Sequence, residues 1–252
     1  ESQLFNPMRD GGHSLSSWGK QIGFSKGEYN DFNTFSKDML EYCIRDTKLT
    51  RKLAYKLSEE GKMFSTRSYE LERKIRAIID QQEKNGFAFN LRKAMSFLAT
   101  LEEEEQSLKD KAQEMFEPIE VKLKTKTKYI PFNIGSRKQI AERLMERGWE
   151  PTHHTEKGNV IVNEDVLSKI NMPEAEMFSR YFLLQKRTGL IKAWIEACQE
   201  DNRVRGRVMT LRTVTGRMAH NSPNMAQVPA VYSPYGKECR SLWTVSNPDT
   251  HT

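Results

Sequence analysis

The sequence predicts an α+β fold that is mostly helical, with short antiparallel strands toward its C-terminal end. Between residues 35 and 198, apolar side chains recur at every third or fourth position over several long segments, which is the period of an amphipathic helix. Beyond Asp201 the period changes to two, with Val204, Val208 and Thr210 set among basic residues, a pattern typical of strands. The chain of 252 residues is long enough for two modest domains or one assembly of subdomains.

A loop-rich segment and one long helix are expected first. Residues 1–35 are rich in Gly, Ser and Asn, which favours loops. A helix is predicted over 35–59, because one stripe carries apolar side chains three, four or seven positions apart: Met39, Tyr42, Cys43, Leu49, Leu53 and Leu57. The stretch "SEEGKMFSTRS" breaks this pattern and predicts a linker.

Two further helices are expected around a short extended connection. The first covers 69–85, ends at the helix stop Asn85-Gly86, and has an apolar face of Leu71, Ile75, Ile78 and Ile79. The letters "FAFN" predict the extended connection, and a long helix follows over 91–116.

The stretch "VKLKTKTKYI" places a lysine at every second position, namely at residues 122, 124, 126 and 128. If the stretch is extended, all four side chains point to one side, a spacing that suits a phosphate backbone. A basic loop that binds nothing in particular explains the same letters equally well.

The segment "FNIGSRKQIAERLMERGW" predicts a capped helix. Ser136 suits the N-cap, because its hydroxyl can accept a hydrogen bond from the first turn. Arg137 and Lys138 follow in that turn, where exposed N–H groups attract a phosphate. The last long helix is expected over 174–198.

The composition limits the kinds of partner and compartment that fit the chain. The 40 basic residues exceed the 34 acidic ones, giving a net charge of +6, which fits a phosphate-backbone partner and equally fits many other basic proteins. No apolar run approaches the roughly 18 residues of a membrane span, so no membrane partner is expected. The three cysteines are odd in number and far apart, which indicates a reducing compartment rather than a disulfide framework.

The most informative stretch is "TVTGRMAHNSPNMAQVP", residues 213–229. It is too polar and too broken by Gly and Pro for a helix or a core strand. Its arginine and amide side chains can contact any sequence in the minor groove, where base pairs offer acceptors at similar positions. Gly216 permits close approach of the backbone beside Arg217. The alternative is an ordinary polar surface loop.

This stretch resembles the segment of family A DNA polymerases usually written T-x-x-G-R-x-x-x-x-x-P-N-L-x-x-I-P. The longer form "TGRMAHNSPNMAQVPAVYSPYGKECRSLW" is most similar to the phage T7 group. The resemblance runs back in family order through "QKRTG", "TEKGNVIV" and "FNIGSRKQIAERLMERGW" to "YCIRD", over nearly the whole chain. It implies a DNA-directed DNA polymerase that acts in DNA replication on primer-template DNA and deoxynucleotides.

The resemblance also implies a division of the chain. Residues 1–62 would be the C-terminal part of a DnaQ-like 3′–5′ exonuclease domain, 63–200 the thumb, and 201–252 the start of the palm. The helices over 69–85 and 91–116 would form the long antiparallel pair of the thumb. The T7 enzyme carries a thumb insertion that recruits thioredoxin, and the short passage here from the thumb helix to "FNIGSR" leaves no room for one. Dependence on thioredoxin is therefore not expected.

The exonuclease resemblance singles out Tyr42 and Asp46, which match the Tyr-x-x-x-Asp motif of that domain. It implies that Asp46 holds a divalent metal ion and that Tyr42 orients the attacking water. One turn of helix separates the two residues, so both can face one metal site. Two-metal hydrolysis needs further carboxylates, which the resemblance places upstream of Glu1. This piece alone is expected to lack exonuclease activity.

The polymerase resemblance assigns the DNA contacts. Ser136, Arg137 and Lys138 would touch backbone phosphates, and Arg217 the primer end in the minor groove. Asn224 and Gln227 would lie along the duplex, and Arg240 near the incoming nucleotide or the template edge. The same motifs add Lys186, Arg187, Thr213 and His220 to the DNA-binding set.

The resemblance places the catalytic residues of the palm and the fingers after Thr252. The parent would use two Mg²⁺ ions, and the piece itself is expected not to polymerise. A phage enzyme would act in the cytoplasm of an infected bacterial cell. Three alternatives stay open: a non-catalytic nucleic-acid-binding protein, one half of a split polymerase, and a 3′–5′ exonuclease with an unrelated appendage.

Overall fold

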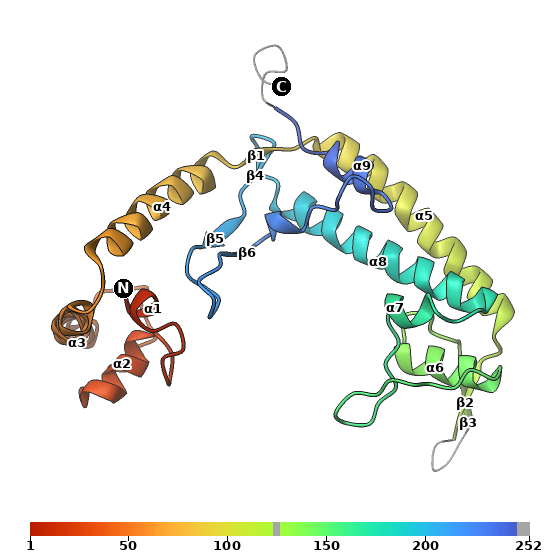
Figure 1. Cartoon of the computed structure of the whole chain (residues 1–252), viewed down its shortest axis with the longest axis horizontal. Coiled ribbons are helices and arrows are strands. Elements are labelled where there is room, and N and C mark those ends of the chain that lie inside the picture. The colour runs from red at the N-terminus through yellow and green to blue at the C-terminus, as the bar shows by residue number, and fades with distance from the viewer. Residues whose placement is uncertain (123–126, 246–252) are drawn as a thin grey trace. The chain divides into compact units, whose positions relative to one another are not determined.

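The computed structural model describes residues 1–122 and 127–245, and they form two compact units. Unit 1 combines Glu1–Gly86 with Arg205–Ala226, and unit 2 combines Phe87–Val204 with the chain from Gln227 on. The element labels below are those of Figure 1. Residues 124 and 126, two of the four lysines of the basic run, lie outside the described residues.

Unit 1 begins with two short helices where the sequence predicted loops. These are α1 (Ser2–Phe5) and α2 (Leu15–Ile22). Helix α2 has complete end signals, because Ser14 accepts a hydrogen bond from the backbone N–H of Ser17 and Gly23 ends the helix at a φ of 70°. Trp18 is buried at 1% exposure, so this part of the chain has a small core of its own.

The predicted helix over 35–59 is confirmed as α3 (Lys37–Gly61), which Ser36 caps. Leu49 and Leu57 are buried on the expected stripe, but Cys43 is exposed. The inclusion of Cys43 in the apolar stripe was therefore wrong. Since the helix extends to Gly61, the predicted linker shrinks to the four residues before the next helix.

Helix α4 (Thr66–Asn85) confirms the next prediction, and Gly86 ends it as expected. Ile79 is buried, whereas Leu71 and Ile78 are 56% and 67% exposed. Half of the predicted apolar face thus lies outside the core of unit 1. The periodicity located the helix correctly and overstated how much of its surface is covered.

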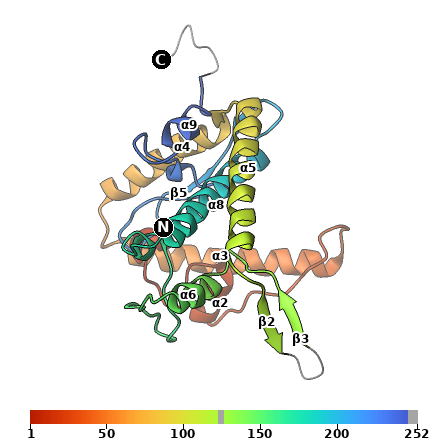
Figure 2. The same cartoon turned by 90° about the vertical axis from the view of Figure 1, so that its right-hand side faces the viewer.

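Unit 2 is built on α5 (Leu91–Met115) and α8 (Pro173–Ala197), which run antiparallel side by side (Figures 1 and 2). The expected pairing of the 91–116 helix with the 69–85 helix was wrong, because α5 packs along α8. Ion pairs follow the contact, with Glu102 bound to Lys192 at 2.7 Å and Glu104 bound to Arg180 at 2.6 Å. Helix α8 is buried on several faces, which explains how it organises the unit.

The two described lysines of the basic run, Lys122 and Lys128, lie in different strands. Strands β2 (Ile119–Lys122) and β3 (Thr127–Ile130) pair as an antiparallel hairpin, with Val121 opposite Lys128 (Figure 2). The interpretation in which the whole run is one extended stretch was therefore wrong for Lys122 and Lys128, because these two lysines belong to different antiparallel strands.

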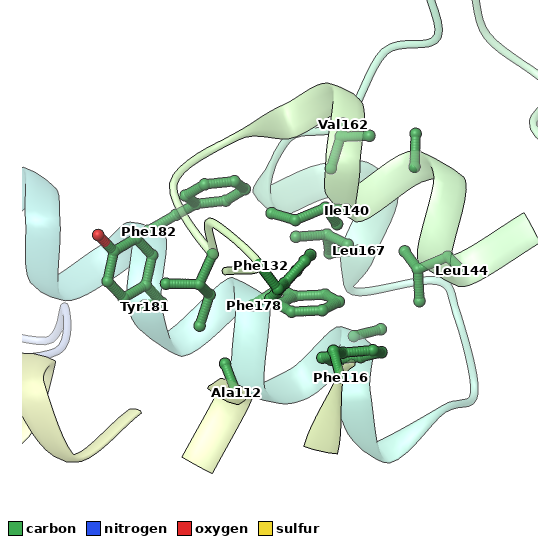
Figure 3. Close-up of a cluster of buried hydrophobic side chains, with 13 residues drawn as sticks. Ala112, Phe116, Phe132, Ile140, Leu144, Val162, Leu167, Phe178, Tyr181 and Phe182 are labelled. Atoms are coloured by element: carbon green, nitrogen blue, oxygen red, sulfur yellow. The ribbon is translucent and has the colours of Figure 1, made fainter. Parts of the chain in front are cut away.

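A core of aromatic and aliphatic side chains joins α5 and α8 to two smaller helices, α6 (Arg137–Glu146) and α7 (Glu164–Leu167). Figure 3 shows Phe116, Phe132 and Phe178 in this core, and their ring centroids are 4.7 to 5.9 Å apart. These contacts join the end of α5, the segment before α6, and α8.

Strands follow Asp201 as predicted, but they are only two or three residues long. In unit 2, β4 (Arg203–Val204) pairs with β1 (Phe87–Ala88). In unit 1, β5 (Arg207–Met209) pairs with β6 (Ala219–Asn221). The 3₁₀ helix η1 (Met225–Gln227) and helix α9 (Gly236–Arg240) complete the described chain. Among the described residues, no helix is both long enough and apolar enough to cross a membrane.

Candidate nucleic-acid interface

A tight turn in unit 1 presents Arg217 between β5 and β6. The Thr213 hydroxyl accepts a hydrogen bond from the Arg217 backbone N–H at 2.8 Å, and the Thr213 carbonyl accepts one from Gly216 at 3.0 Å. Gly216 has a φ of 75°, which a residue with a side chain rarely adopts. The backbone of Arg217 is thus held while its side chain is exposed. Within the described part of the chain, its guanidinium makes no hydrogen bond or ion pair.

His220 lies opposite Val208 in the β5–β6 ladder and is half-buried. Its Nδ1 is buried and, within the described residues, has no hydrogen-bond partner. Asn224 follows beyond β6, and its side-chain oxygen accepts a hydrogen bond from the backbone N–H of Ala226 at 3.0 Å. This bond leaves the amide N–H₂ of Asn224 as the donor that can meet a base acceptor.

The start of α6 in unit 2 carries the predicted phosphate contacts. Ser136 is the N-cap, as expected, and its hydroxyl accepts a hydrogen bond from Gln139. Arg137 and Lys138 are exposed in the first turn. The Lys138 ammonium is 3.9 Å from Glu142 and its side chain is 86% exposed, so this ion pair holds it only weakly.

A polar hollow of about 630 Å³ brings Arg137 together with Lys186. Arg137 stacks over the ring of Phe182 at 5.5 Å, and Lys186 is exposed on α8. Glu164 and Asp165 line the same hollow. The hollow is therefore lined by two cations and two carboxylates.

Arg187 differs from its neighbour Lys186, because it is buried at 7% exposure. Its Nε donates a hydrogen bond to the Pro234 carbonyl at 3.2 Å. Arg240 is exposed, and its Nε binds the Pro229 carbonyl at 2.8 Å. Both arginines thus brace the segment from Pro229 to Pro234.

The sequence did not predict the cluster that holds the other end of this segment. Glu104 on α5 accepts hydrogen bonds from Tyr235 at 2.5 Å and from Arg180, whose guanidinium also bonds to the Tyr235 hydroxyl. Burial, aided by the bond to Glu104, raises the pKa of Tyr235 to about 12. Burial also raises the pKa of Glu104, but the bonds from Tyr235 and Arg180 outweigh it and lower that pKa below its ordinary value.

Tyr42 and Asp46 lie one turn apart on α3, and both are half-buried. The sequence missed their partner, Lys26. Its ammonium is 3.5 Å from Asp46 and 5.3 Å from the centre of the Tyr42 ring. Its hydrogen bond to Tyr42, with help from Asp46, raises the pKa of Lys26 despite partial desolvation.

One carboxylate beside a lysine does not form a two-metal centre. Asp46 does offer a buried Oδ1 atom that has no partner among the described residues, but its other oxygen faces the Lys26 ammonium. Across residues 1–122 and 127–245, no three His, Cys, Asp or Glu side chains gather closely enough to hold a metal ion. The described residues therefore do not fit a complete exonuclease metal site.

The predicted site residues divide between the two units. Unit 1 holds the exonuclease pair and the residues around the tight turn, namely Tyr42, Asp46, Thr213, Arg217, His220 and Asn224. Unit 2 holds Ser136, Arg137, Lys138, Lys186, Arg187, Gln227 and Arg240. Gln227 is exposed at the end of η1.

Comparison with known proteins gives one family. The sequence profile of DNA polymerase family A matches residues 99–251. The DNA-directed DNA polymerase of Escherichia phage T7 is 25% identical over 93% of this chain, and that of Enterobacteria phage T3 is 26% identical over the same share. The chain spans about half the length of these relatives, 48% in each case. Both alignments run over 337 positions, so the relatives carry segments that this chain lacks.

A solved structure has the same fold. It is the POL domain of Pol1 from M. smegmatis in complex with DNA primer-template and dNTP, with a TM-score of 0.78. The likeness covers 97% of this chain and 40% of that one, at 15% sequence identity.

Proposed function

The chain belongs to DNA polymerase family A, and from this we propose that it grips primer-template duplex as part of a phage-type DNA-directed DNA polymerase. The observation that carries the proposal is the Thr213–Arg217 turn, which holds the backbone of an exposed arginine at a fixed place. A cation on a short fixed turn can enter the minor groove and contact base acceptors that occur in every sequence.

The exposed cations of unit 2 supply a separate set of duplex contacts in this proposal. Arg137, Lys138 and Lys186 lie beside one hollow or in the first turn of α6, where N–H groups also point outward. Such groups contact phosphates without reading sequence. The polymerase from M. smegmatis, which has this fold, was solved with DNA primer-template and dNTP, so we propose the same classes of partner here.

In this proposal, phosphoryl transfer is catalysed by the whole protein and not by this chain alone. Two Mg²⁺ ions would supply charge neutralisation for phosphoryl transfer. The residues of this chain hold and orient the duplex so that the primer end is presented in one position. We further propose that the protein works in the cytoplasm of an infected bacterium and does not depend on thioredoxin.

The exonuclease role of Tyr42 and Asp46 is proposed only for the whole protein. Asp46 Oδ1, which is buried and has no partner among the described residues, supports it, because such an atom is a ready ligand for a cation. A non-catalytic binding protein or half of a split polymerase would use the same duplex contacts. These alternatives therefore differ from the main proposal only in whether, and by which chain, the polymerase reaction is catalysed.

Equilibrium binding of labelled primer-template tests the proposal. We expect Arg217→Ala to weaken binding by roughly five- to thirtyfold on several unrelated sequences alike, the effect of losing a charged hydrogen bond. Arg212→Ala is the matched control, since Arg212 is an exposed arginine of the same connection. Equal losses for the two variants, or a loss in Arg217→Ala that depends on sequence, would contradict the proposed minor-groove contact.

A further inference from the structure

Two side chains of α4 bind the backbone of one residue in β5. Glu83 accepts a hydrogen bond from the Val208 N–H at 2.6 Å, and Arg76 donates one to the Val208 carbonyl at 2.8 Å. The Val208 side chain is buried at 1% exposure. The helix thus supplies the two hydrogen bonds that a neighbouring strand would supply on the outer edge of β5.

The two side chains also bind each other, so Glu83, Arg76 and the Val208 backbone form a closed ring of hydrogen bonds. Arg76 donates to Glu83 at 2.9 Å, and it bonds to Asp80 one turn away. Arg205, just before β5, donates to the carbonyl of Lys84 in the last turn of α4 at 2.9 Å. Several bonds therefore fix β5 against the C-terminal half of α4, and all of them lie within unit 1.

We call the bonds from Glu83 and Arg76 to the Val208 backbone the clamp. The clamp matters because the pairing of β5 with β6 is too short to hold the two strands in place by itself. Their ladder has only three residue pairs, Arg207 with Asn221, Val208 with His220 and Met209 with Ala219. A two-stranded hairpin of this length is unstable without packing against another element. The turn that carries Arg217 connects these two strands, so its direction depends on how β5 is held.

We propose that Glu83 and Arg76 are positioning residues, which aim Arg217 at duplex DNA by fixing the backbone of Val208. The inference rests on the proposed function and adds residues that touch no DNA themselves. The positioning role and simple electrostatics predict opposite changes in DNA affinity when Glu83 is replaced by a neutral residue. Removing the Glu83 carboxylate raises the positive charge of the protein, which by itself strengthens binding to DNA, whereas loss of the clamp weakens it.

A double-mutant cycle with Arg217 separates positioning from general damage. In the otherwise wild-type chain, we expect Glu83→Ala to weaken binding of labelled primer-template by roughly fivefold. In the Arg217→Ala background the same substitution should change affinity less than about twofold. Glu83→Gln should retain most of the affinity, because its amide oxygen can still accept the Val208 hydrogen bond.

Glu70→Ala is the control for charge, since Glu70 is an exposed carboxylate on the same helix, and it should leave binding unchanged or slightly stronger. If Glu83→Ala fails to fold, Arg76→Ala, which removes the donor to the Val208 carbonyl, takes its place in the cycle with the same expectation. Equal losses in both backgrounds, or no loss in either, would overturn the positioning role. If Arg217→Ala itself has no effect, the proposed function fails and the positioning role with it.

Discussion

Tyr235 donates a hydrogen bond to Glu104 at 2.5 Å and thereby ties the N-cap of α9 to the middle of α5. The two residues are 131 positions apart in the sequence. With Arg180 and the Arg187–Pro234 bond, this contact fixes the segment that runs from Gln227 to Arg240 within unit 2. Predicted DNA contacts stand at both ends of that segment, so its stability bears on function.

The Tyr235–Glu104 bond predicts a loss of stability in alkali. Burial and the bond to Glu104 raise the pKa of Tyr235 from 10.0 to about 12, so the folded chain holds this proton more tightly than the unfolded chain. The contribution is complete below about pH 10 and disappears as the pH rises toward 12. Its size, allowing for partial exposure, is about 1 kcal/mol.

Denaturant unfolding between pH 9 and 12 measures this contribution. The wild-type free energy of unfolding should fall more steeply across pH 10–12 than that of Tyr235→Phe, which has no hydroxyl to ionise. Parallel curves for the two proteins would show that the Tyr235 proton is not held by the fold.

Removing either of two neighbouring cations on α8, Arg187 or Lys186, should have different effects on the free energy of unfolding. Arg187→Ala removes a buried guanidinium and leaves the Pro234 carbonyl unpaired, so we expect the free energy of unfolding to fall by about 1–3 kcal/mol. Lys186→Ala, at an exposed site, should change it by less than about 0.5 kcal/mol while weakening DNA binding. Thermal unfolding alongside duplex titration measures both. Full stability with weakened binding in Arg187→Ala would mean that Arg187 contacts DNA directly.

Two glycines give a matched pair for testing the packing of α9. A Cβ on Gly236 would overlap the Ala230 carbonyl oxygen, whereas one on Gly189 would meet nothing within 4 Å. We expect Gly236→Ala to destabilise the protein by about 2–4 kcal/mol. Gly189→Ala, within α8, should stabilise it by about 0.5–1 kcal/mol. A Gly236→Ala variant as stable as wild type would contradict the described path of the segment before α9.

Duplex binding should depend steeply on salt, because exposed cations supply most of the contacts. Each phosphate contact contributes a slope of about −0.9 to log K against log salt concentration. Arg137→Ala, Lys138→Ala and Lys186→Ala should each reduce the magnitude of that slope by about one, with no change in sequence preference. Binding that is the same at low and moderate salt would rule out a phosphate-based grip.

The long helices could be predicted because their signals are local. Ser36, Ser136 and Gly86 mark helix ends through their own side chains or lack of one, and the apolar period marks the helix between. The same signals were present at Ser14 and Gly23 around α2. There the surrounding Gly- and Ser-rich composition hid a helix of only eight residues.

Partners in space could not be predicted, since periodicity shows that a face is apolar but not what covers it. Helix α5 therefore received the wrong partner. The β2–β3 hairpin was missed for a related reason: the letters between the two strands contain no Gly, Asn or Pro to signal a turn. Lys26, Glu83 and Arg180 were missed because each acts on residues distant in the sequence.

The most direct test of the central claim replaces single atoms of the DNA. Primer-template duplexes with 3-deazaadenine at one position at a time lack one minor-groove acceptor, and 7-deazaadenine lacks one in the major groove. We predict that 3-deaza substitution near the primer end weakens binding by the wild-type chain, but not by Arg217→Ala, and that 7-deaza substitution affects neither. A loss that is equal in both proteins, or that follows 7-deaza substitution instead, would contradict the assignment of Arg217 to the minor groove.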